Sequence, residues 1–324
     1  MIGMSPMVEI EDLAIGFPEA NGTMRRVADG VSVAVEEGQS VAVVGESGSG
    51  KSLTALALLG LLPGAARVLG GSLRVAGVEV QSASEGVLQG LRGRVVGLVQ
   101  QDPGAAFNPV RRLWPQVSEA ATRHRLVRSR AERLDLAVRL LGEVGLEEPR
   151  EMADAFPHQL SGGQRQRAAI AAALSARPRL LLADEPTSAL DSISQSAILR
   201  LLAHLGDERG LTLLTITHDL RLAAVMAGTI TVLHAGETVE RGPRQRVLEG
   251  PAHPYTRGLL TGEIAARPAG VAGGHQARQA CRFASRCPRV MPRCHEARPA
   301  LSPLPGNRVV RCFLWSEASE GVHA

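Results

Sequence analysis

The sequence is almost without lysine. Lys51 is the only lysine in 324 residues, and the other basic side chains, histidine aside, are all arginine. A genome whose base composition favours arginine codons explains most of this imbalance, but it does not explain why one lysine survives. Aromatic residues are also scarce, at 2% of the chain. A hydrophobic core must therefore be built from leucine, valine, isoleucine and alanine, which suits buried strands covered by helices.

Two further absences restrict the class of protein. No stretch approaches the roughly 18 consecutive apolar residues of a transmembrane helix. Residues 1–40 lack the basic segment followed by an apolar segment that marks a secretory signal. The net charge is +4, yet the arginines are spread along the chain rather than massed, which argues against a nucleic-acid partner. We expect a cytosolic protein, or one that binds a membrane only through partners.

The order of strand-like and helix-like segments indicates the fold class. A length of 324 residues accommodates one large domain and a smaller appendage. Residues 8–35 alternate as edge strands and hairpins do, and apolar strands then alternate with helices along residues 41–99 and 180–233. This alternation predicts an α/β protein with a mostly parallel sheet covered on both faces. From residue 251 the composition shifts to proline, glycine, arginine and all four cysteines, which predicts a separate C-terminal extension with a linker at residues 265–279.

Lys51 belongs to a complete phosphate-binding motif. Residues 45–52 read Gly-Glu-Ser-Gly-Ser-Gly-Lys-Ser, follow an apolar strand at 41–44 and precede a predicted helix at 52–62. This is the context that the pattern G-x-x-x-x-G-K-[ST] requires. The glycines let backbone N–H groups approach phosphate oxygens at the positive end of the helix. The compact ammonium of Lys51 reaches between β- and γ-phosphates, for which the planar arginine fork has the wrong shape, and Ser52 offers a hydroxyl to Mg²⁺.

Two carboxylates and a second glycine motif extend the candidate site. An apolar strand at residues 180–183 ends in Asp184 and Glu185. We expect Asp184 to hold the Mg²⁺ shell and Glu185 to act as general base for the attacking water. Residues 160–164, Leu-Ser-Gly-Gly-Gln, precede an alanine-rich helix and form another phosphate-facing helix start. One chain does not need two such loops for one phosphate tail.

Six motifs in this order resemble those of the ATP-binding cassette (ABC) ATPases. They are the Walker A motif at residues 45–52, the Q-loop at Gln101, the signature at 160–164, the Walker B motif at 180–185, the D-loop at 188–191 and the switch histidine at His218. The resemblance implies an ABC-type P-loop NTPase fold with a RecA-like core, an N-terminal antiparallel β-subdomain and a helical signature subdomain. The helical subdomain is expected at about residues 103–176, within a nucleotide-binding domain at residues 7–250.

The resemblance also implies a head-to-tail dimer with each ATP held between two subunits. It assigns catalytic roles to Glu185, His218, Gln101 and Lys51, and Mg²⁺ ligation to Ser52, Gln101 and Asp184. The residues implied for ATP are Phe17, Gly45, Glu46, Ser47, Gly48, Ser49, Gly50, Lys51, Ser52 and Leu53 of one subunit, and Ser161, Gly162, Gly163, Gln164 and Asp191 of the other. Phe17 is the candidate that stacks on adenine, with a hydrophobic anchor of the N-terminal sheet as the alternative.

Three stretches resemble the branch of oligopeptide, dipeptide and nickel importers. They are residues 101–109, 183–191 and 251–260, the last of which contains a His-Pro-Tyr-Thr element that other ABC branches generally lack. This branch implies an ATPase that powers peptide import from the cytoplasmic face of the bacterial inner membrane. The implied partners are a second ATP-binding subunit, two transmembrane permease subunits and, indirectly, an extracytoplasmic solute-binding protein.

The sequence leaves other functions open. The same branch includes ATPases of importers for nickel or other small solutes. A non-transport ABC ATPase acting on ribosomes or DNA usually has two cassettes or a long coiled-coil insertion, and this sequence has neither. In a further alternative, the cysteine module senses iron or redox state and the ATPase activity is subordinate to it.

The four cysteines lie in the C-terminal extension, which we place at residues 251–324. They are Cys281, Cys287, Cys294 and Cys312. A reducing cytosol disfavours disulfides, whereas four thiolates can hold Zn²⁺ or a [4Fe–4S] cluster. Zinc sites favour closely paired cysteines, which are absent, while irregular spacing and the proline after Cys287 suit a cluster. Members of the peptide-importer branch carry such cysteines and some bind a [4Fe–4S] cluster, so we predict a cluster, with zinc or no metal as alternatives.

Overall fold

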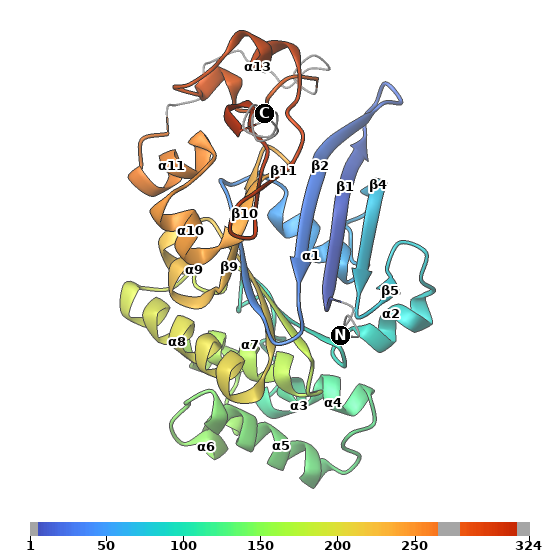
Figure 1. The fold of residues 1–324 in the computed structure, drawn as a ribbon. Helices are drawn as coiled ribbons and strands as arrows, with labels where there is room; N and C mark the ends of the chain where they lie inside the picture. Colours follow the sequence, from blue (N-terminus) through green and yellow to red (C-terminus); the bar gives the residue numbers. More distant parts are fainter. Residues whose placement is uncertain (1–5, 265–278, 316–324) are drawn as a thin grey trace, which may run out of the picture.

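The structure is a computed structural model that describes residues 6–264 and 279–315 (Figure 1). It contains two sheets with helices packed around them, so the predicted α/β class is confirmed. The linker predicted at residues 265–279 lies, except for its last residue, outside the described residues. In the part of the chain that the structure describes, no helix is both long enough and apolar enough to cross a membrane.

The first sheet is antiparallel and formed by the N-terminal part of the chain, in the strand order β2-β1-β4-β5. Its inner face is aliphatic, as the scarcity of aromatic residues predicts: Val8, Ile10, Leu13 and Ile15 of β1 are all buried. The strands are β1 (Val8–Pro18), β2 (Met24–Val35), β4 (Arg67–Val75) and β5 (Val78–Glu79).

The second sheet is larger, with the strand order β11-β12-β10-β9-β3-β8-β7-β6. Its centre is parallel, since β3 pairs in parallel with β8 and β9, and β7 with β6 and β8. Nearly all residues of these central strands are buried, as expected for a parallel sheet covered on both faces. The strands are β3 (Ser40–Val44), β6 (Val96–Val99), β7 (Leu180–Asp184), β8 (Thr212–Thr217), β9 (Thr229–His234), β10 (Glu237–Pro243), β11 (Ser302–Leu304) and β12 (Arg308–Val310).

A group of helices lies at one end of the molecule, where the helical subdomain is expected (green in Figure 1). Its longest helices begin at capping boxes, in which a serine side chain and a residue three positions later satisfy each other's backbone N–H groups. The helices are α3 (Leu113–Val117), α4 (Glu119–Arg123), α5 (Arg130–Glu143), α6 (Pro149–Asp154), η1 (Pro157–Gln159) and α7 (Gly162–Leu174).

The remaining helices lie around the two sheets and in the C-terminal region (Figure 1). The helix after the phosphate-binding motif ends at Leu58 rather than near residue 62, because Gly60 takes a φ of 62° that breaks the helix. These helices are α1 (Lys51–Leu58), α2 (Glu85–Leu91), α8 (Ser192–Arg209), α9 (Leu220–Met226), α10 (Arg244–Glu249), α11 (Pro254–Thr261), η2 (Ala284–Arg286), α13 (Pro292–Glu296) and η3 (Phe313–Trp315).

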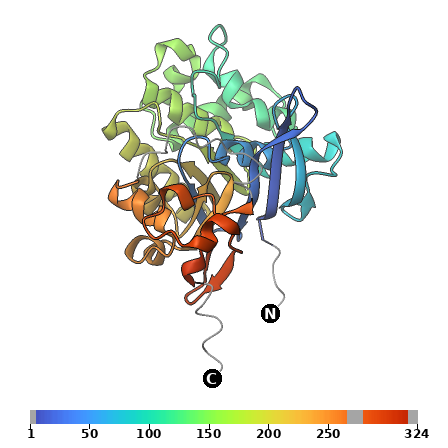
Figure 2. The ribbon, with the colours of Figure 1, turned by 90° about the horizontal axis from the view of Figure 1, so that it is seen from above.

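The C-terminal region is joined to the large sheet. Its hairpin of β11 and β12 pairs with β10, with Glu240 opposite Val310 and Arg241 opposite Val309. Figures 1 and 2 both show the region (red) beside β10 and α11 (orange), at the end of the molecule opposite the helical subdomain. The sequence predicts a separate extension, but this hairpin continues the sheet.

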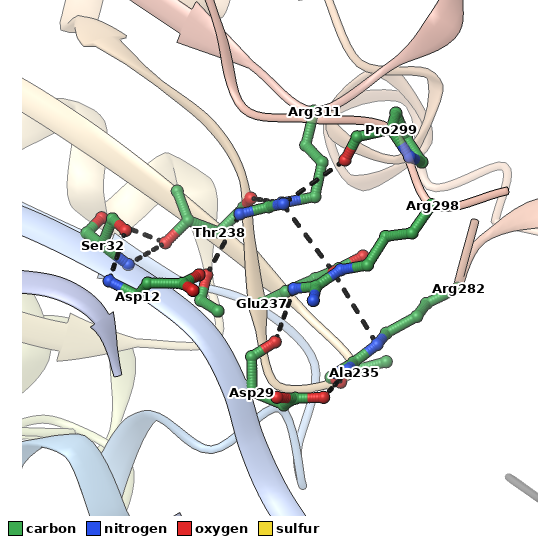
Figure 3. Close-up of polar contacts among 11 residues, drawn as sticks. Asp12, Asp29, Ser32, Ala235, Glu237, Thr238, Arg282, Arg298, Pro299 and Arg311 are labelled. Atoms are coloured by element: carbon green, nitrogen blue, oxygen red, sulfur yellow. Dashed lines mark hydrogen bonds and ion pairs between the residues drawn. The ribbon is translucent and has the colours of Figure 1, made fainter. Parts of the chain in front are cut away.

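A buried carboxylate ties the C-terminal region to both sheets (Figure 3). Glu237, at the start of β10, is 2% exposed. Its Oε2 lies 2.7 Å from Nε of Arg298, 3.7 Å from Nε of Arg282 and 3.8 Å from Nε of Arg311. Arg282 also pairs with Asp29 of β2 at 2.6 Å. Because a buried charge is costly without partners, this arrangement holds the C-terminal region in one position against the sheets.

Candidate nucleotide-binding site

The loop at residues 45–52 connects β3 to α1 and has the backbone that the motif requires. Gly45 lies so close to β9 that an added Cβ atom would stand 2.2 Å from the carbonyl oxygen of Leu233, so only glycine fits there. Gly50 immediately precedes α1 with a φ of 91°, a conformation that favours glycine. The loop therefore lies against the N-terminal end of α1, where backbone N–H groups and the helix dipole favour an anion.

Lys51 is the buried cation of this loop. It is 4% exposed, and its Nζ donates hydrogen bonds to the carbonyl oxygens of Gly45, at 2.8 Å, and Glu46, at 3.0 Å. Burial lowers the pKa of the Lys51 ammonium, whereas the Glu185 and Asp184 carboxylates act to raise it. The lysine therefore lies within electrostatic range of both acids that the sequence predicts for the site.

Ser52 and Asp184 meet at the edge of the loop. The Ser52 hydroxyl donates a hydrogen bond to Oδ1 of Asp184, the last residue of β7, at 3.1 Å. Burial raises the pKa of Asp184, and the Ser52 hydrogen bond opposes this rise. Hydroxyl and carboxylate oxygens are the hard ligands that Mg²⁺ prefers, usually together with water and phosphate. The donor chemistry therefore fits the Mg²⁺ that the ABC resemblance implies.

Two residues that the sequence predicts for the site lie next to Glu185, each just after a different strand. Glu185 Oε2 lies 3.2 Å from Nε2 of Gln101, which follows β6, and 3.3 Å from Nδ1 of His218, which follows β8. Glu185 has a φ of 44°, in the left-handed region that non-glycine residues seldom adopt. Strained backbone of this kind is concentrated at functional sites.

The signature residues lie apart from this group. Ser161 caps α7 by accepting a hydrogen bond from the Gln164 N–H at 3.2 Å, and the Gln164 side chain accepts one from the Ser161 N–H at 2.8 Å. The start of α7 lies beside the start of α8, since a Cβ atom on Gly163 would be 3.4 Å from the hydroxyl of Ser194. Asp191 caps α8 by accepting from the Ser194 N–H at 3.0 Å. Between the described residues, no hydrogen bond or ion pair joins residues 161–164 to residues 45–52.

The other residues predicted to bind the nucleotide differ in how deeply they are buried. Phe17 and Leu53 are half-buried and pack against the hydrophobic cluster between the N-terminal sheet and α1. Ser47 and Gly48 are exposed, and Ser49 is buried. This packing matches the alternative interpretation of Phe17 as an anchor of the sheet, and its stacking on adenine stays a prediction.

Comparison with known proteins agrees with this geometry. The sequence matches the ABC transporter family over residues 28–188 and the oligopeptide/dipeptide transporter C-terminal region over residues 239–294. It is 37% identical over 315 residues to the dipeptide transport ATP-binding protein DppD of Escherichia coli (strain K12), and this match covers 94% of the chain and 96% of DppD. The chain belongs to the ABC transporter ATP-binding family.

A second relative of this ABC ATPase is the oligopeptide transport ATP-binding protein AppD of Bacillus subtilis (strain 168). The two are 37% identical over 324 residues, and the match covers 97% of the chain and 98% of AppD. The resemblance to the peptide-transport branch is therefore confirmed.

Solved ABC structures share the fold of this ABC ATPase. The dimeric post-hydrolysis structure of the ATP-binding cassette MJ0796, bound to ADP and Pi, is 30% identical with a TM-score of 0.66, and the match covers 74% of the chain and 99% of that cassette. The structure of cbiO1 from Clostridium perfringens is 26% identical with a TM-score of 0.64, and the match covers 76% of the chain and 92% of that protein. The predicted ABC fold is thus confirmed.

The predicted [4Fe–4S] site is not supported by the structure. All four cysteines are described and free, and among residues 6–264 and 279–315 no three histidine, cysteine, aspartate or glutamate side chains form a group that can hold a metal ion. The Cys287 thiol accepts a hydrogen bond from the Arg289 N–H at 3.4 Å, and burial raises the pKa of Cys281 to about 12. The four thiols still belong to one module, since burial and neighbouring cysteines both raise the pKa of Cys281, Cys287 and Cys312.

Three residues that the sequence does not assign to the site contact its loop through Glu46. The Tyr255 hydroxyl accepts a hydrogen bond from the Glu46 N–H at 2.9 Å. The guanidinium of Arg286 pairs with the Glu46 carboxylate, and His234 Nδ1 lies 4.0 Å from Oε2 of the same carboxylate. Tyr255 belongs to the His-Pro-Tyr-Thr element, which marks the branch without indicating a contact. Nothing local marks His234 or Arg286, because their contacts are long-range.

Two buried histidines, His234 and His253, predict a loss of stability in mild acid. Burial lowers the pKa of His234 to about 4 and that of His253 to about 3. Since an unfolded histidine titrates near pH 6.5, the unfolded chain binds more protons than the folded one below that pH. The free energy of unfolding should therefore fall by about 1.4 kcal/mol per pH unit for each histidine as the pH drops from about 6.5 toward 4.

Urea unfolding at a series of pH values checks this expectation. In the variant His234→Gln the pH slope should be reduced by the share of one histidine. An unchanged slope in His234→Gln would contradict the assignment. The groups that face His234 are Glu46, Arg286 and Arg282.

Proposed function

We propose that this chain is the ATP-hydrolysing subunit of an importer that carries peptides across the bacterial inner membrane. The observation that carries the proposal is the match to the oligopeptide/dipeptide transporter C-terminal region at residues 239–294, in a chain that also contains a full set of ABC motifs. The relatives named above are a dipeptide and an oligopeptide transport ATP-binding protein. This favours peptides over nickel or other small solutes, and transport over a mechanical or sensory role.

The residues of this chain bind ATP and activate water in the proposed mechanism. Lys51 exchanges its hydrogen bonds to the carbonyl oxygens of Gly45 and Glu46 for bonds to the β- and γ-phosphates. Ser52, Asp184 and Gln101 would hold Mg²⁺, which would neutralise phosphate charge there. Glu185 accepts the proton of the attacking water. His218, whose Nδ1 lies 3.3 Å from Glu185 Oε2, contacts the γ-phosphate and supports the transition state.

The second half of each ATP site comes from another subunit in this proposal. Ser161, Gly162, Gly163 and Gln164 of one subunit face the γ-phosphate held by the other, and Asp191 borders the same interface. Two observations support this arrangement: between the described residues no hydrogen bond or ion pair joins residues 161–164 to residues 45–52, and the related cassette MJ0796 was solved as a dimer bound to ADP and Pi. ATP then closes the dimer, and hydrolysis opens it.

The proposal places the dimer on two permease subunits at the cytoplasmic face of the inner membrane. The region around Gln101 transmits closure of the dimer to the permeases, and an extracytoplasmic solute-binding protein delivers the peptide to them. Adenine stacks on Phe17. In this proposal residues 7–250 are the nucleotide-binding domain and residues 251–324 are a C-terminal module, whose hairpin of β11 and β12 extends the large sheet.

A separate part of the proposal is that the four cysteines bind a [4Fe–4S] cluster. The cluster would be held by Cys281, Cys287, Cys294 and Cys312, each of whose thiols lies within electrostatic range of at least one other. Anaerobically purified full-length protein should then contain stoichiometric iron and sulfide and be brown. A colourless preparation that contains zinc, or no metal, would refute the cluster.

Peptide uptake tests the proposed function in cells. We expect cells whose chromosomal gene encodes Glu185→Gln to lose uptake of a radiolabelled dipeptide, and a plasmid copy of the wild-type gene to restore it. The variant Glu208→Gln is the control, since its side chain is 68% exposed on α8. Normal peptide uptake in the Glu185→Gln strain, with loss of uptake of nickel instead, would overturn the peptide assignment in favour of the metal importer.

A further inference from the structure

Glu46, the second residue of the phosphate-binding loop, is held by the C-terminal region through its side chain. Arg286, at the end of η2, donates from Nη1 to Glu46 Oε2 at 2.9 Å and from Nη2 to Oε1 at 2.7 Å. The Arg286 side chain is 11% exposed and that of Glu46 is 38% exposed. A planar guanidinium that binds both oxygens of a carboxylate fixes its orientation as well as its position.

The backbone of Glu46 is held at two further points. Its N–H donates to the hydroxyl of Tyr255 on α11 at 2.9 Å, and its carbonyl oxygen accepts from Nζ of Lys51 at 3.0 Å. Tyr255 is fully buried. Arg286 and Tyr255, which both lie beyond residue 250, therefore hold Glu46 from more than two hundred residues away along the chain.

The two residues beyond 250 that hold Glu46 are themselves fixed in place. The ring of Tyr255 packs on those of His234 and Phe283, at centroid distances of 4.3 Å and 5.5 Å. The Arg286 guanidinium lies 5.9 Å from the centroid of Phe283, a cation–π arrangement. The Glu237 contacts of Figure 3 hold the same region against both sheets. A side chain that is restrained in this way can restrain the loop that it contacts.

We infer that Arg286 and Tyr255 are positioning residues for nucleotide binding, which hold Glu46 so that the loop at residues 45–52 keeps the shape that receives the phosphates. The inference rests on the proposed ATP site at this loop. Both residues contact Glu46, and in this inference they act on the nucleotide through it. The C-terminal region is accordingly a structural part of the ATP site as well as a mark of the transporter branch.

Calorimetric titration of the full-length protein with ADP and Mg²⁺ tests this inference, because ADP occupies the loop through its β-phosphate without being hydrolysed. Arg286→Gln should raise the Kd about tenfold, as expected for loss of one charge-assisted pair, and Arg286→Lys should recover part of the loss. Tyr255→Phe keeps the ring but removes the acceptor of the Glu46 N–H, and it should also raise the Kd. Arg289→Gln, which removes an exposed arginine of the same region, is the matched control and should bind as wild type does.

A double-mutant cycle separates positioning from general stability. If Arg286 acts through Glu46, the double variant Glu46→Gln/Arg286→Gln should bind ADP no more weakly than either single variant. Wild-type affinity in both Arg286→Gln and Tyr255→Phe, with only a lower Tm, would overturn the inference and leave these residues a structural role. Failure of the ATP site itself looks different: the wild type would not bind ADP, or Lys51→Ala would bind it equally well.

Discussion

Replacement of Glu185 by glutamine is expected to reduce ATP turnover by about 100-fold or more while ATP still binds, because a general base contributes at least this much. In the wild type, Gln101 Nε2 donates a hydrogen bond to Glu185 Oε2 at 3.2 Å. Glutamine has nearly the same size as glutamate and keeps an oxygen that can accept this hydrogen bond. It cannot accept the proton of the attacking water. Lys51, Ser52 and Asp184 are unchanged in the variant, so the affinity for ATP should persist.

The measurement is single-turnover hydrolysis together with equilibrium binding of ATP. Glu208→Gln is the matched control, because its side chain is 68% exposed. It should hydrolyse ATP as the wild type does. Wild-type turnover in Glu185→Gln would refute the general-base assignment, and loss of ATP binding would instead assign Glu185 to the binding of Mg²⁺ or nucleotide.

Replacement of Ser161 by aspartate is expected to abolish hydrolysis for a different reason. Aspartate is as good an N-cap as serine, so α7 should keep the cap that Ser161 now provides to the Gln164 N–H. In the proposed dimer, however, the new carboxylate faces the γ-phosphate of the other subunit. Such a juxtaposition of like charges costs several kcal/mol, which corresponds to a loss of turnover of about 100-fold or more.

Comparison of Ser161→Asp with Lys51→Ala separates the two halves of the site. Lys51→Ala should lose ATP binding by the isolated chain, because Nζ is then absent from the loop. Ser161→Asp should bind ATP normally as an isolated chain. It should fail only in hydrolysis, which requires two subunits to close on the ATP. Ser161→Thr, which keeps both the hydroxyl and the cap, is the control that should remain active. Weak ATP binding by isolated Ser161→Asp would contradict the assignment of Ser161 to the second subunit's site.

The sequence predicts the loop at residues 45–52 and the acids at the end of β7 because each is a local pattern with a local physical cause. At position 45 a Cβ atom would collide with the backbone of β9, and at position 50 the backbone has a positive φ that favours glycine. The meeting of Gln101, Glu185 and His218 follows from a parallel sheet, since the carboxyl ends of β6, β7 and β8 lie at the same edge. Local sequence patterns are therefore sufficient to predict these parts of the candidate site.

The C-terminal region is harder to predict, because its contacts join distant parts of the chain. The irregular composition beyond residue 251 suggests a separate extension, but pairing of β12 with β10 continues the large sheet. The contacts of Arg286 and Tyr255 with Glu46 leave no periodic signal in the sequence. Spacing of the cysteines suggests a cluster, yet in the described residues their side chains do not form a metal-binding group.

The sharpest test of an ATP site shared between subunits is ATP turnover per chain, measured during dilution while sedimentation reports the oligomeric state. If each chain holds only half of an ATP site, ATP turnover per chain should fall toward zero as the dimers dissociate. Added Lys51→Ala chain should restore turnover, because its signature at residues 161–164 is intact. Where the natural dimer pairs this chain with a different ATP-binding subunit, that subunit should restore turnover through its own signature. Constant turnover per chain, at dilutions where only single chains sediment, would contradict the proposal that Lys51 holds only half of an ATP site.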